Sequence, residues 1–202
     1  MNKDDGQLRF HGAVTPLMQL LLRRRSCRKY AEGAASPEQI EALLERARSF
    51  QDRCGFRAPR LLVVSGAELE RVVRAAMRGL MVTVNPWLPS TAARHLLLCG
   101  AAWAEGAEPA AIEHALAEAA MTMQVALLAA TEVGLGSCWL AGIDHTAVEQ
   151  ALALPDGAKL MAISPLGLPP PKKGLWDAAL FHISSKRRKP LETLWMKEQW
   201  PS

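Results

Sequence analysis

Hydrophobic residues recur at helical spacing through the middle of the chain, most clearly from Pro109 to about Val133. This stretch lacks internal glycine and proline and is rich in Ala, Leu, Met and Glu, so it predicts one long helix. Its main apolar stripe consists of Ile112, Leu116, Ala119, Met123, Leu127, Ala130 and Val133. Alanines also occupy the flanks of the stripe, which indicates a helix packed on more than one side. Pro109 suits its first turn, and Gly134 suits its end.

The remaining pattern predicts shorter helices alternating with buried strands. Helices are expected over residues 16–25, 37–48, 66–78 and 145–152, and strands over 61–65, 95–100, 139–141 and 158–166. Ser36 and Asp144 are the expected N-caps of two of the helices. Residues 49–60 and 79–93 show no clear period and are expected to be loops. Such an order of elements indicates an α+β or α/β sandwich.

Composition fits one globular domain over residues 1–202, since half of the residues are hydrophobic and 22% are charged. No apolar run is long enough to span a bilayer, and the order of apolar and basic residues near the start is not that of a secretory signal. The four cysteines form no CxxC pair, so neither a zinc site nor a disulfide framework is expected. We therefore expect a protein of the reducing cytoplasm that spans no membrane.

Positive charge is concentrated in two clusters near the two ends of the chain. The first lies within residues 23–29 and the second within 186–189. A basic run alone is usually a solvated helix end, but two such clusters together suggest one anion held from both sides. Three glycines, Gly134, Gly136 and Gly142, lie in a bend after the long helix. They suit either the approach of a flat or anionic ligand to the backbone, or a helix end and strand entry without a ligand.

Four motifs occur in an order and at a spacing that resemble those of the nitroreductase family of FMN-dependent oxidoreductases. They are RRSCRKY at residues 24–30, GLGSCW at 134–139, LGLP at 166–169 and KRRKPL at 186–191. The resemblance covers roughly residues 16–195. It implies an α+β fold, a nitroreductase-like three-layer α/β/α sandwich with a mixed, mainly antiparallel sheet. It also implies a homodimer with FMN at the subunit interface, in which the C-terminal tail, residues 172–202, packs on the partner.

The resemblance assigns the FMN phosphate and ribityl chain to the two basic clusters. The matching residues are Arg24, Arg25, Ser26, Lys186 and Arg188. Arginine forks and a hydroxyl group suit a phosphomonoester, because bidentate charge-assisted hydrogen bonds are strong.

Other matching residues are expected to line the flavin ring. Arg28 falls where the family places a cation beside N1 and the C2 carbonyl, and such a charge would stabilise the reduced ring. Trp139, Leu140, Ala141 and Gly142 match the segment along the ring, with the backbone N–H of Gly142 at N5. Many relatives carry glutamate where this chain has Ala141.

The clearest departure from the family lies in residues 47–56. Relatives commonly carry A-P-S-x-x-N-x-Q-P-W there, and this chain reads ARSFQDRCGF. Ser49 is retained, whereas Asp52 replaces the asparagine as a candidate flavin contact and Phe56 replaces the tryptophan. Aspartate brings a charge and cannot donate an amide hydrogen bond.

Three functions remain to be weighed. The first is an FMN oxidoreductase in which NAD(P)H reduces the flavin, which then reduces a nitroaromatic, quinone or enone by a ping-pong mechanism. The alternative is a flavin-binding protein with little NAD(P)H turnover, used for sequestration, sensing or a specialised flavin reaction. Nucleic-acid binding ranks far below, because the chain has few aromatic residues and no known docking motif.

Structural roles, and not chemical ones, are expected for several cysteine, tryptophan and histidine residues. Cys27 and Cys138 are expected to fill the core rather than react, and Trp139 is expected mainly to pack. His95 and His114 have no second ligand at metal spacing, which favours structural roles.

Overall fold

The computed structural model describes residues 14–140 and 142–171. Residues Thr15–Pro171 form one compact unit. Ala141, Lys186, Arg188 and the rest of the tail lie outside the described residues.

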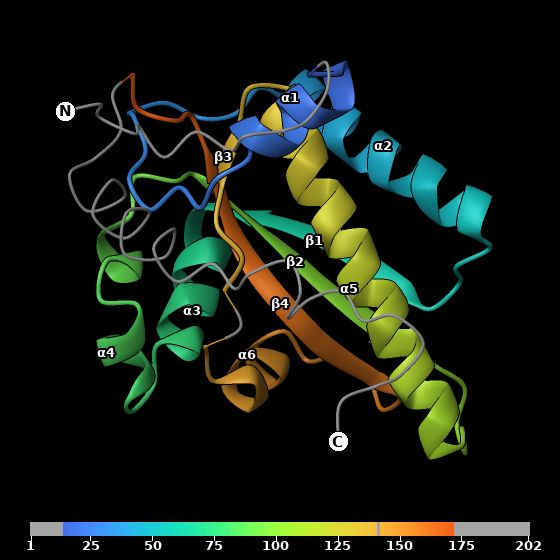
Figure 1. Cartoon of the computed structure of the whole chain (residues 1–202). Coiled ribbons are helices and arrows are strands. Elements are labelled where there is room, and N and C mark those ends of the chain that lie inside the picture. Colours follow the sequence, from blue (N-terminus) through green and yellow to red (C-terminus); the bar gives the residue numbers. More distant parts are fainter. Residues whose placement is uncertain (1–13, 141, 172–202) are drawn as a thin grey trace, which may run out of the picture. The chain divides into compact units, whose positions relative to one another are not determined.

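A four-stranded antiparallel sheet forms the centre of this unit (Figure 1). Its strands are β1 (Pro59–Ser65), β2 (His95–Ala102), β3 (Gly136–Ser137) and β4 (Ala158–Gly167), in the order β1-β2-β4-β3. His95 pairs with Ser65 on one side and with Leu166 on the other, which fixes the register across three strands. The expected strands at 61–65, 95–100 and 158–166 are confirmed.

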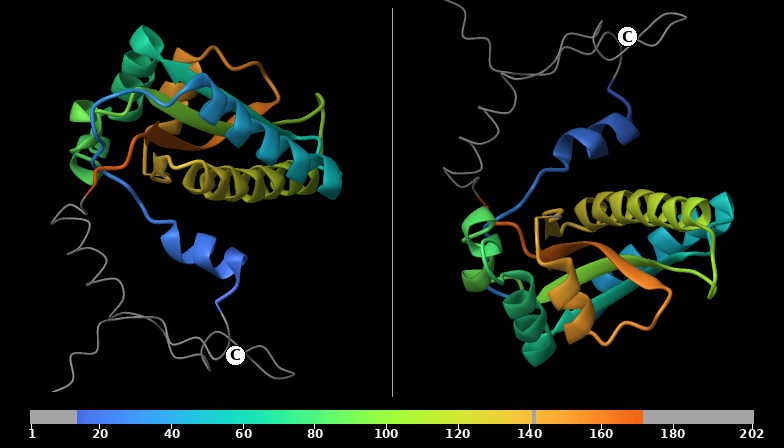
Figure 2. Two further views of the ribbon diagram at one scale, coloured as in Figure 1. Left: turned by 90° about the horizontal axis from the view of Figure 1, so that it is seen from above. Right: turned by 90° about the horizontal axis from the view of Figure 1, so that it is seen from below.

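Each face of the sheet carries its own apolar cluster. Leu61 and Val63 pack into a cluster with α2 (Pro37–Cys54) and α5 (Pro109–Glu132). Val64 points the other way, into a cluster with α3 (Gly66–Ala76) and α6 (His145–Ala151), because side chains alternate along a strand. Figure 2 shows α5 and α6 on opposite sides of the sheet.

The predicted long helix is confirmed as α5. Its fully buried side chains include Ala119, Met123 and Leu127, and it packs against α2 and against the sheet. The helix ends at Glu132, two residues before Gly134, whose φ of 84° is the left-handed conformation expected after a helix.

Helix α2 is longer than the sequence pattern predicts. Ser36 caps it with a full capping box to Gln39, as expected, but the helix continues through Cys54 and ends at Gly55. The expected loop over residues 49–60 is therefore wrong for its first half. No proline or glycine interrupts residues 49–54, and Arg48 pairs with both Glu45 and Asp52 across the last turns.

The weak stretch at 79–93 contains two short helices rather than loop alone. These are α4 (Met81–Val84) and the 3-10 helix η1 (Leu88–Ser90). The first helix of the unit, α1 (Pro16–Arg23), lies where the sequence predicts it. Among the described residues, no helix is long and apolar enough to cross a membrane.

Candidate functional site

The first basic cluster runs directly beside the glycine-bearing bend. After α1 the chain becomes extended, and Ser26 forms a parallel bridge with Ser137 of β3. The backbone N–H of Cys27 donates to the carbonyl of Ser137 at 2.8 Å. Arg23 also donates to the carbonyl of Thr131 near the end of α5, so α1 lies beside that end of the long helix (Figure 1). The backbone of Ser26 and Cys27 therefore lies beside Ser137 of the bend.

Buried residues anchor this extended segment and leave its polar side chains nearer the surface. The hydroxyl of Tyr30 donates to the carbonyl of Cys27 at 2.6 Å, and Ala31 donates to the carbonyl of Leu168 at 2.9 Å. Cys27 and Tyr30 are buried, whereas Arg24, Arg25, Ser26 and Arg28 are half-buried. Guanidinium groups are suited to bind an anion, because their planar fork of donors matches carboxylate and phosphate oxygens.

Gly136 makes this close approach possible. A Cβ at position 136 would lie 2.9 Å from the sulfur of Cys27, so a larger residue would push the basic segment away. The left-handed φ of Gly134 fits the helix-end explanation, whereas Gly136 allows two segments of the chain to pack closely, which neither explanation had anticipated.

The bend itself is held by the sheet. The N–H of Cys138 donates to Ser164 Oγ at 3.0 Å, and Leu140 exchanges backbone hydrogen bonds with Ile163. Leu140 is buried in one apolar cluster and Trp139 packs against the other. The strand expected at 139–141 is therefore only a single β-bridge at Leu140. The regular strand in this part of the chain is β3, which lies earlier, at Gly136–Ser137.

Gly142 is where the bend meets α4. The residue is exposed, and its carbonyl accepts a hydrogen bond from Asn85 Nδ2 at 3.0 Å. A Cβ at this position would lie 3.1 Å from Val84 Cγ1, which leaves little room for a side chain. No sequence pattern indicates this pairing, because Asn85 and Val84 lie in a stretch without a clear hydrophobic period.

Asp52 is not brought to the bend within one chain. It lies on the exposed last turn of α2 and pairs with Arg48 at 2.9 Å. Near the opposite end of α2, Gln39 donates to the carbonyl of Val133, next to the bend. The helical rise between Gln39 and Asp52 separates them by about 20 Å.

The buried thiols are part of the packed core, whereas His114 is exposed and contacts a carboxylate. Cys27, Cys99 and Cys138 are buried, and burial raises the pKa of Cys99 to about 12. This agrees with the expectation that Cys27 and Cys138 fill the core. His114 pairs with Glu118 at 3.3 Å, and among residues 14–140 and 142–171 no group of three or more His, Cys, Asp or Glu could hold a metal ion.

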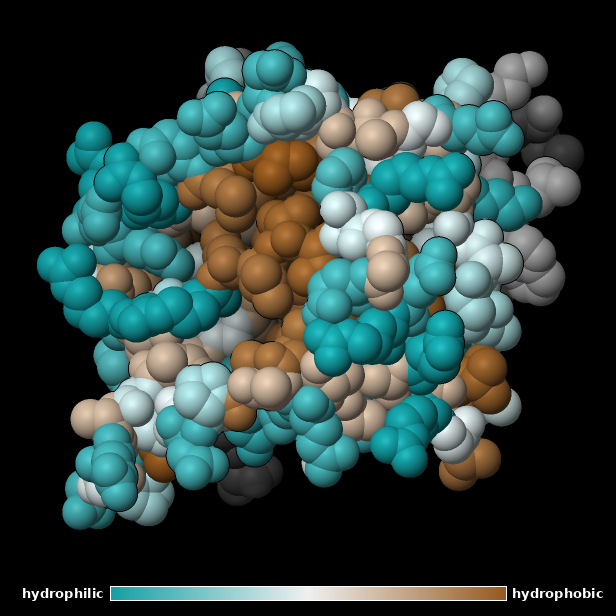
Figure 3. Space-filling view, turned by 180° about the vertical axis from the view of Figure 1, so that it is seen from behind, coloured by the Kyte–Doolittle hydropathy of each residue, from teal (hydrophilic) through white to brown (hydrophobic). Residues whose placement is uncertain are grey.

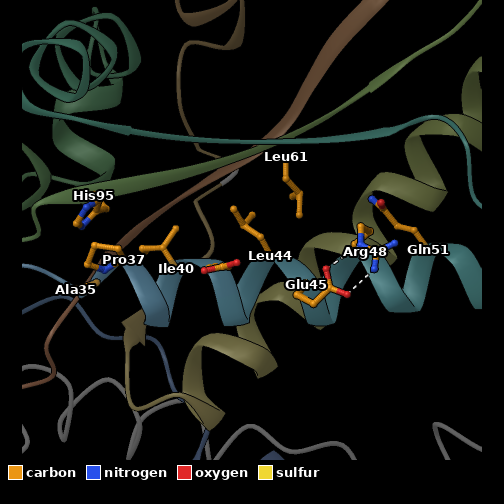
Figure 4. A pocket seen from close by; sticks show the side chains of 10 residues that line it. Ala35, Pro37, Ile40, Leu44, Glu45, Arg48, Gln51, Leu61 and His95 are labelled. Atoms are coloured by element: carbon orange, nitrogen blue, oxygen red, sulfur yellow. Dashed lines mark hydrogen bonds and ion pairs between the residues drawn. The ribbon is translucent and has the colours of Figure 1, made fainter.

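An apolar groove of about 630 Å³ lies at the other edge of the sheet, between α2 and β1. Ile40, Leu44 and Leu61 line it, with His95 at one end and the Glu45–Arg48 pair at the rim (Figure 4). Figure 3 shows apolar side chains gathered in a hollow on the face turned away in Figure 1. The groove is distinct from the bend, since β1 and β3 are the two outer strands.

Comparison with known proteins identifies the family to which the chain belongs. The profile of the nitroreductase family matches residues 21–168. The chain therefore belongs to the nitroreductase family. Among curated proteins no sequence match was found.

Solved structures share the fold at low sequence identity. A protein from Desulfovibrio desulfuricans in complex with FMN is 23% identical, with 93% of this chain and 99% of that chain covered and a TM-score of 0.67. Nitroreductase A from Vibrio parahaemolyticus is 18% identical, with 94% and 79% covered and a TM-score of 0.73. An iodotyrosine deiodinase bound to FMN and 3-iodo-L-tyrosine is 21% identical, with 78% and 92% covered and a TM-score of 0.61. At these identities the likeness shows a common fold.

Proposed function

We propose that this protein is an FMN-dependent oxidoreductase. The observation that carries the proposal is the backbone pairing of Ser26 with Ser137, which joins the segment that bears the half-buried arginines of residues 24–28 to the start of the bend that leads to Gly142. Membership of the nitroreductase family and the FMN complexes among its structural neighbours support the same cofactor.

The phosphate end of FMN would be held by Arg24, Arg25 and Ser26. Lys186 and Arg188, which lie outside the described residues, would complete the grip from the C-terminal cluster. Guanidinium forks and a hydroxyl supply the charge-assisted hydrogen bonds that a phosphate dianion needs.

The ring end would lie along Trp139 to Gly142, with the Gly142 N–H directed at N5 and Arg28 beside the pyrimidine edge. FMN, when bound, supplies a ring that takes up hydride at N5 and passes electrons to a second substrate. Arg28 would stabilise negative charge on the reduced ring electrostatically. Ala141 supplies no carboxylate next to Gly142, so the backbone amide of Gly142 would make the contact at N5 alone.

NAD(P)H is the proposed donor, and a small planar electrophile is the proposed acceptor. A nitroaromatic, a quinone or an enone would use the place that the nicotinamide has left, which gives ping-pong kinetics. The exposed backbone of Gly142 favours a flat substrate there, because a flat ring can approach a glycine closely.

We propose a single-domain chain, residues 1–202, that works in the cytoplasm as a homodimer of three-layer α/β/α subunits. The tail, residues 172–202, would pack on the partner subunit. Two surfaces of the described part support this assembly: the apolar groove beside the outer strand β1, and the outer side of α5, where Met121 is 44% exposed. The same assembly would let Asp52 approach the flavin of the other subunit, which it does not reach in its own chain.

A second candidate function is a flavin-binding protein with little NAD(P)H turnover. Ala141 in place of the common glutamate and the helical, ion-paired position of Asp52 favour it. Both features alter groups that relatives present to the flavin and its substrates.

Anaerobic mixing of the FMN-loaded protein with NADH and with NADPH separates these functions. The oxidoreductase predicts rapid loss of the flavin absorbance at about 450 nm, followed by its return when a quinone or nitroaromatic is added without oxygen. Flavin that stays oxidised with both nucleotides would contradict the oxidoreductase and support the second candidate. A protein that binds no FMN would contradict both.

A further inference from the structure

Asn85 forms a long-range link between α4 and the bend. It is a largely buried polar residue, 8% exposed, and its Nδ2 donates to the carbonyl of Gly142, which is 57 positions away in the chain, at 3.0 Å. A buried amide group is costly unless it is hydrogen-bonded, so this contact fixes both partners.

Backbone hydrogen bonds and apolar contacts hold Asn85 itself in place. The backbone N–H of Asn85 donates to the carbonyl of Met81 at 3.3 Å, and its carbonyl accepts from the N–H of Leu88 at 3.0 Å. Side-chain contacts of α4 and η1 with the apolar cluster, through Met81 and Leu88, hold this part of the chain against the core. Asn85 therefore extends from a fixed backbone toward the bend.

Gly142 needs an anchor from outside. Leu140 is bonded to Ile163 before it, and the N–H of Asp144 donates to the carbonyl of Ala76 after it. Between these two points Gly142 is exposed, and a glycine backbone has more conformational freedom than any other. The Asn85 hydrogen bond restricts the rotation of the peptide group that follows the Gly142 Cα, and Val84 closes one side of the residue.

We propose that Asn85 is a positioning residue of the flavin site: by holding the carbonyl of Gly142 it fixes the ψ angle of this residue, and so the conformation of the bend whose Gly142 N–H would donate to N5 of bound FMN. This inference rests on the proposed FMN function. Oxidised N5 accepts a hydrogen bond, whereas reduced N5 carries a hydrogen and does not need one from Gly142. A Gly142 backbone that is held in this conformation would therefore strengthen the binding of oxidised FMN and leave the binding of reduced FMN unchanged.

The test compares the variant Asn85→Leu with the wild-type protein. Leucine is of similar size, carries no charge and cannot donate a hydrogen bond. We expect the dissociation constant of oxidised FMN to rise about 3- to 10-fold, the loss of one hydrogen bond. We expect the dissociation constant of reduced FMN to stay the same. The midpoint potential of bound FMN should then rise by about 15 to 30 mV, at about 30 mV per tenfold for a two-electron couple.

Thr83→Ala is the matched control. Thr83 lies on the same short helix, and its hydroxyl donates to the carbonyl of Leu80 at 2.7 Å rather than to the bend. This variant should keep the wild-type affinity and potential. Asn85→Ala provides a second test in case leucine disturbs the packing, and circular dichroism checks that each variant is folded.

Two results would overturn the inference while leaving the FMN function intact. One is wild-type affinity and potential in folded Asn85→Leu and Asn85→Ala. The other is an equal loss of affinity for oxidised and reduced FMN with an unchanged potential, which indicates a purely structural role. A wild-type protein that binds no FMN would instead contradict the proposed function itself, and the Asn85 inference with it.

Discussion

His95 is a partly buried residue whose ring is poorly suited to carry charge. It begins β2 at one end of the apolar groove, and its Nδ1 is buried without a hydrogen-bond partner among the described residues. Burial lowers its pKa below the ordinary value of 6.5. In the unfolded chain the ring takes up a proton more readily, so protonation favours unfolding.

We therefore expect the free energy of unfolding to fall as the pH drops from about 6.5 toward the lower pKa of the folded state. His95→Gln removes the titrating group and should flatten this part of the pH profile, measured by urea denaturation between pH 5 and pH 8, roughly the range in which histidine titrates. An identical pH dependence in wild type and variant would show that His95 is not responsible.

Arg24 and Arg23 are adjacent but have different environments. Arg24 is half-buried in the extended segment beside the bend, whereas Arg23 is exposed on α1 and donates to Thr131. Arg24→Ala should weaken FMN binding by about 1.5 to 3 kcal/mol if the guanidinium bonds the phosphate. Arg23→Ala should change it much less. Fluorescence titration of FMN measures both, and equal effects would contradict the assignment of Arg24.

At the residue scale, the burial of Cys27 and Cys138 could be predicted from the sequence, because an isolated thiol usually fills the core. Asp52 was expected in a loop because its neighbours lack an apolar period, yet ion pairs and an uninterrupted run of helix-compatible residues keep it on α2. The Asn85–Gly142 contact depends on tertiary packing between distant segments, which no local pattern records.

At the scale of the element, α2 depends on its N-terminal cap. The Ser36 side chain accepts from the N–H of Gln39, and the Gln39 side chain accepts from the N–H of Ser36. Ser36→Ala should lower the free energy of unfolding by about 1 kcal/mol, because it leaves a helix donor unsatisfied.

Ser49 provides the control on the same helix. It is exposed and lies near the C-terminal end of α2, where alanine has the better helix propensity. Ser49→Ala should be neutral or slightly stabilising in urea denaturation. A loss as large as that of Ser36→Ala would mean that the capping box is not the cause.

Element types were predictable wherever the hydrophobic period was long or the ends were marked. Helix α5 and strands β2 and β4 were expected close to their observed bounds. Strand β3 lies at residues 136–137 and not at the predicted 139–141. Two residues are too few to show a hydrophobic period, and the pairing of β3 is set by β4 and by the basic segment.

For the whole molecule, the exposed apolar surface bears on assembly. Met121 on the outer side of α5 is 44% exposed, on a helix whose other sides are buried by α2 and the sheet. A homodimer that packs along this helix should be weakened by Met121→Lys, because a buried unpaired charge is costly. Light scattering after size-exclusion chromatography should then show a shift from dimer toward monomer.

Leu80 offers a comparison away from α5. It is an exposed apolar residue next to α4, and Leu80→Lys should leave the dimer intact. A dimer unaffected by Met121→Lys, or a wild-type monomer, would contradict the proposed packing. At this scale the sequence predicted the fold class through its motifs, whereas the proposed packing of the tail, residues 172–202, on a partner lies outside the described residues.

The most direct measurement of the central claim is the visible spectrum of the purified protein, combined with FMN quantification after denaturation. The account predicts a yellow protein, or one that becomes yellow after incubation with FMN and desalting, with absorption at about 450 nm and close to one FMN per chain. A colourless protein that retains no FMN after that incubation would contradict the claim that the basic segment and the Gly142 bend together form a flavin site.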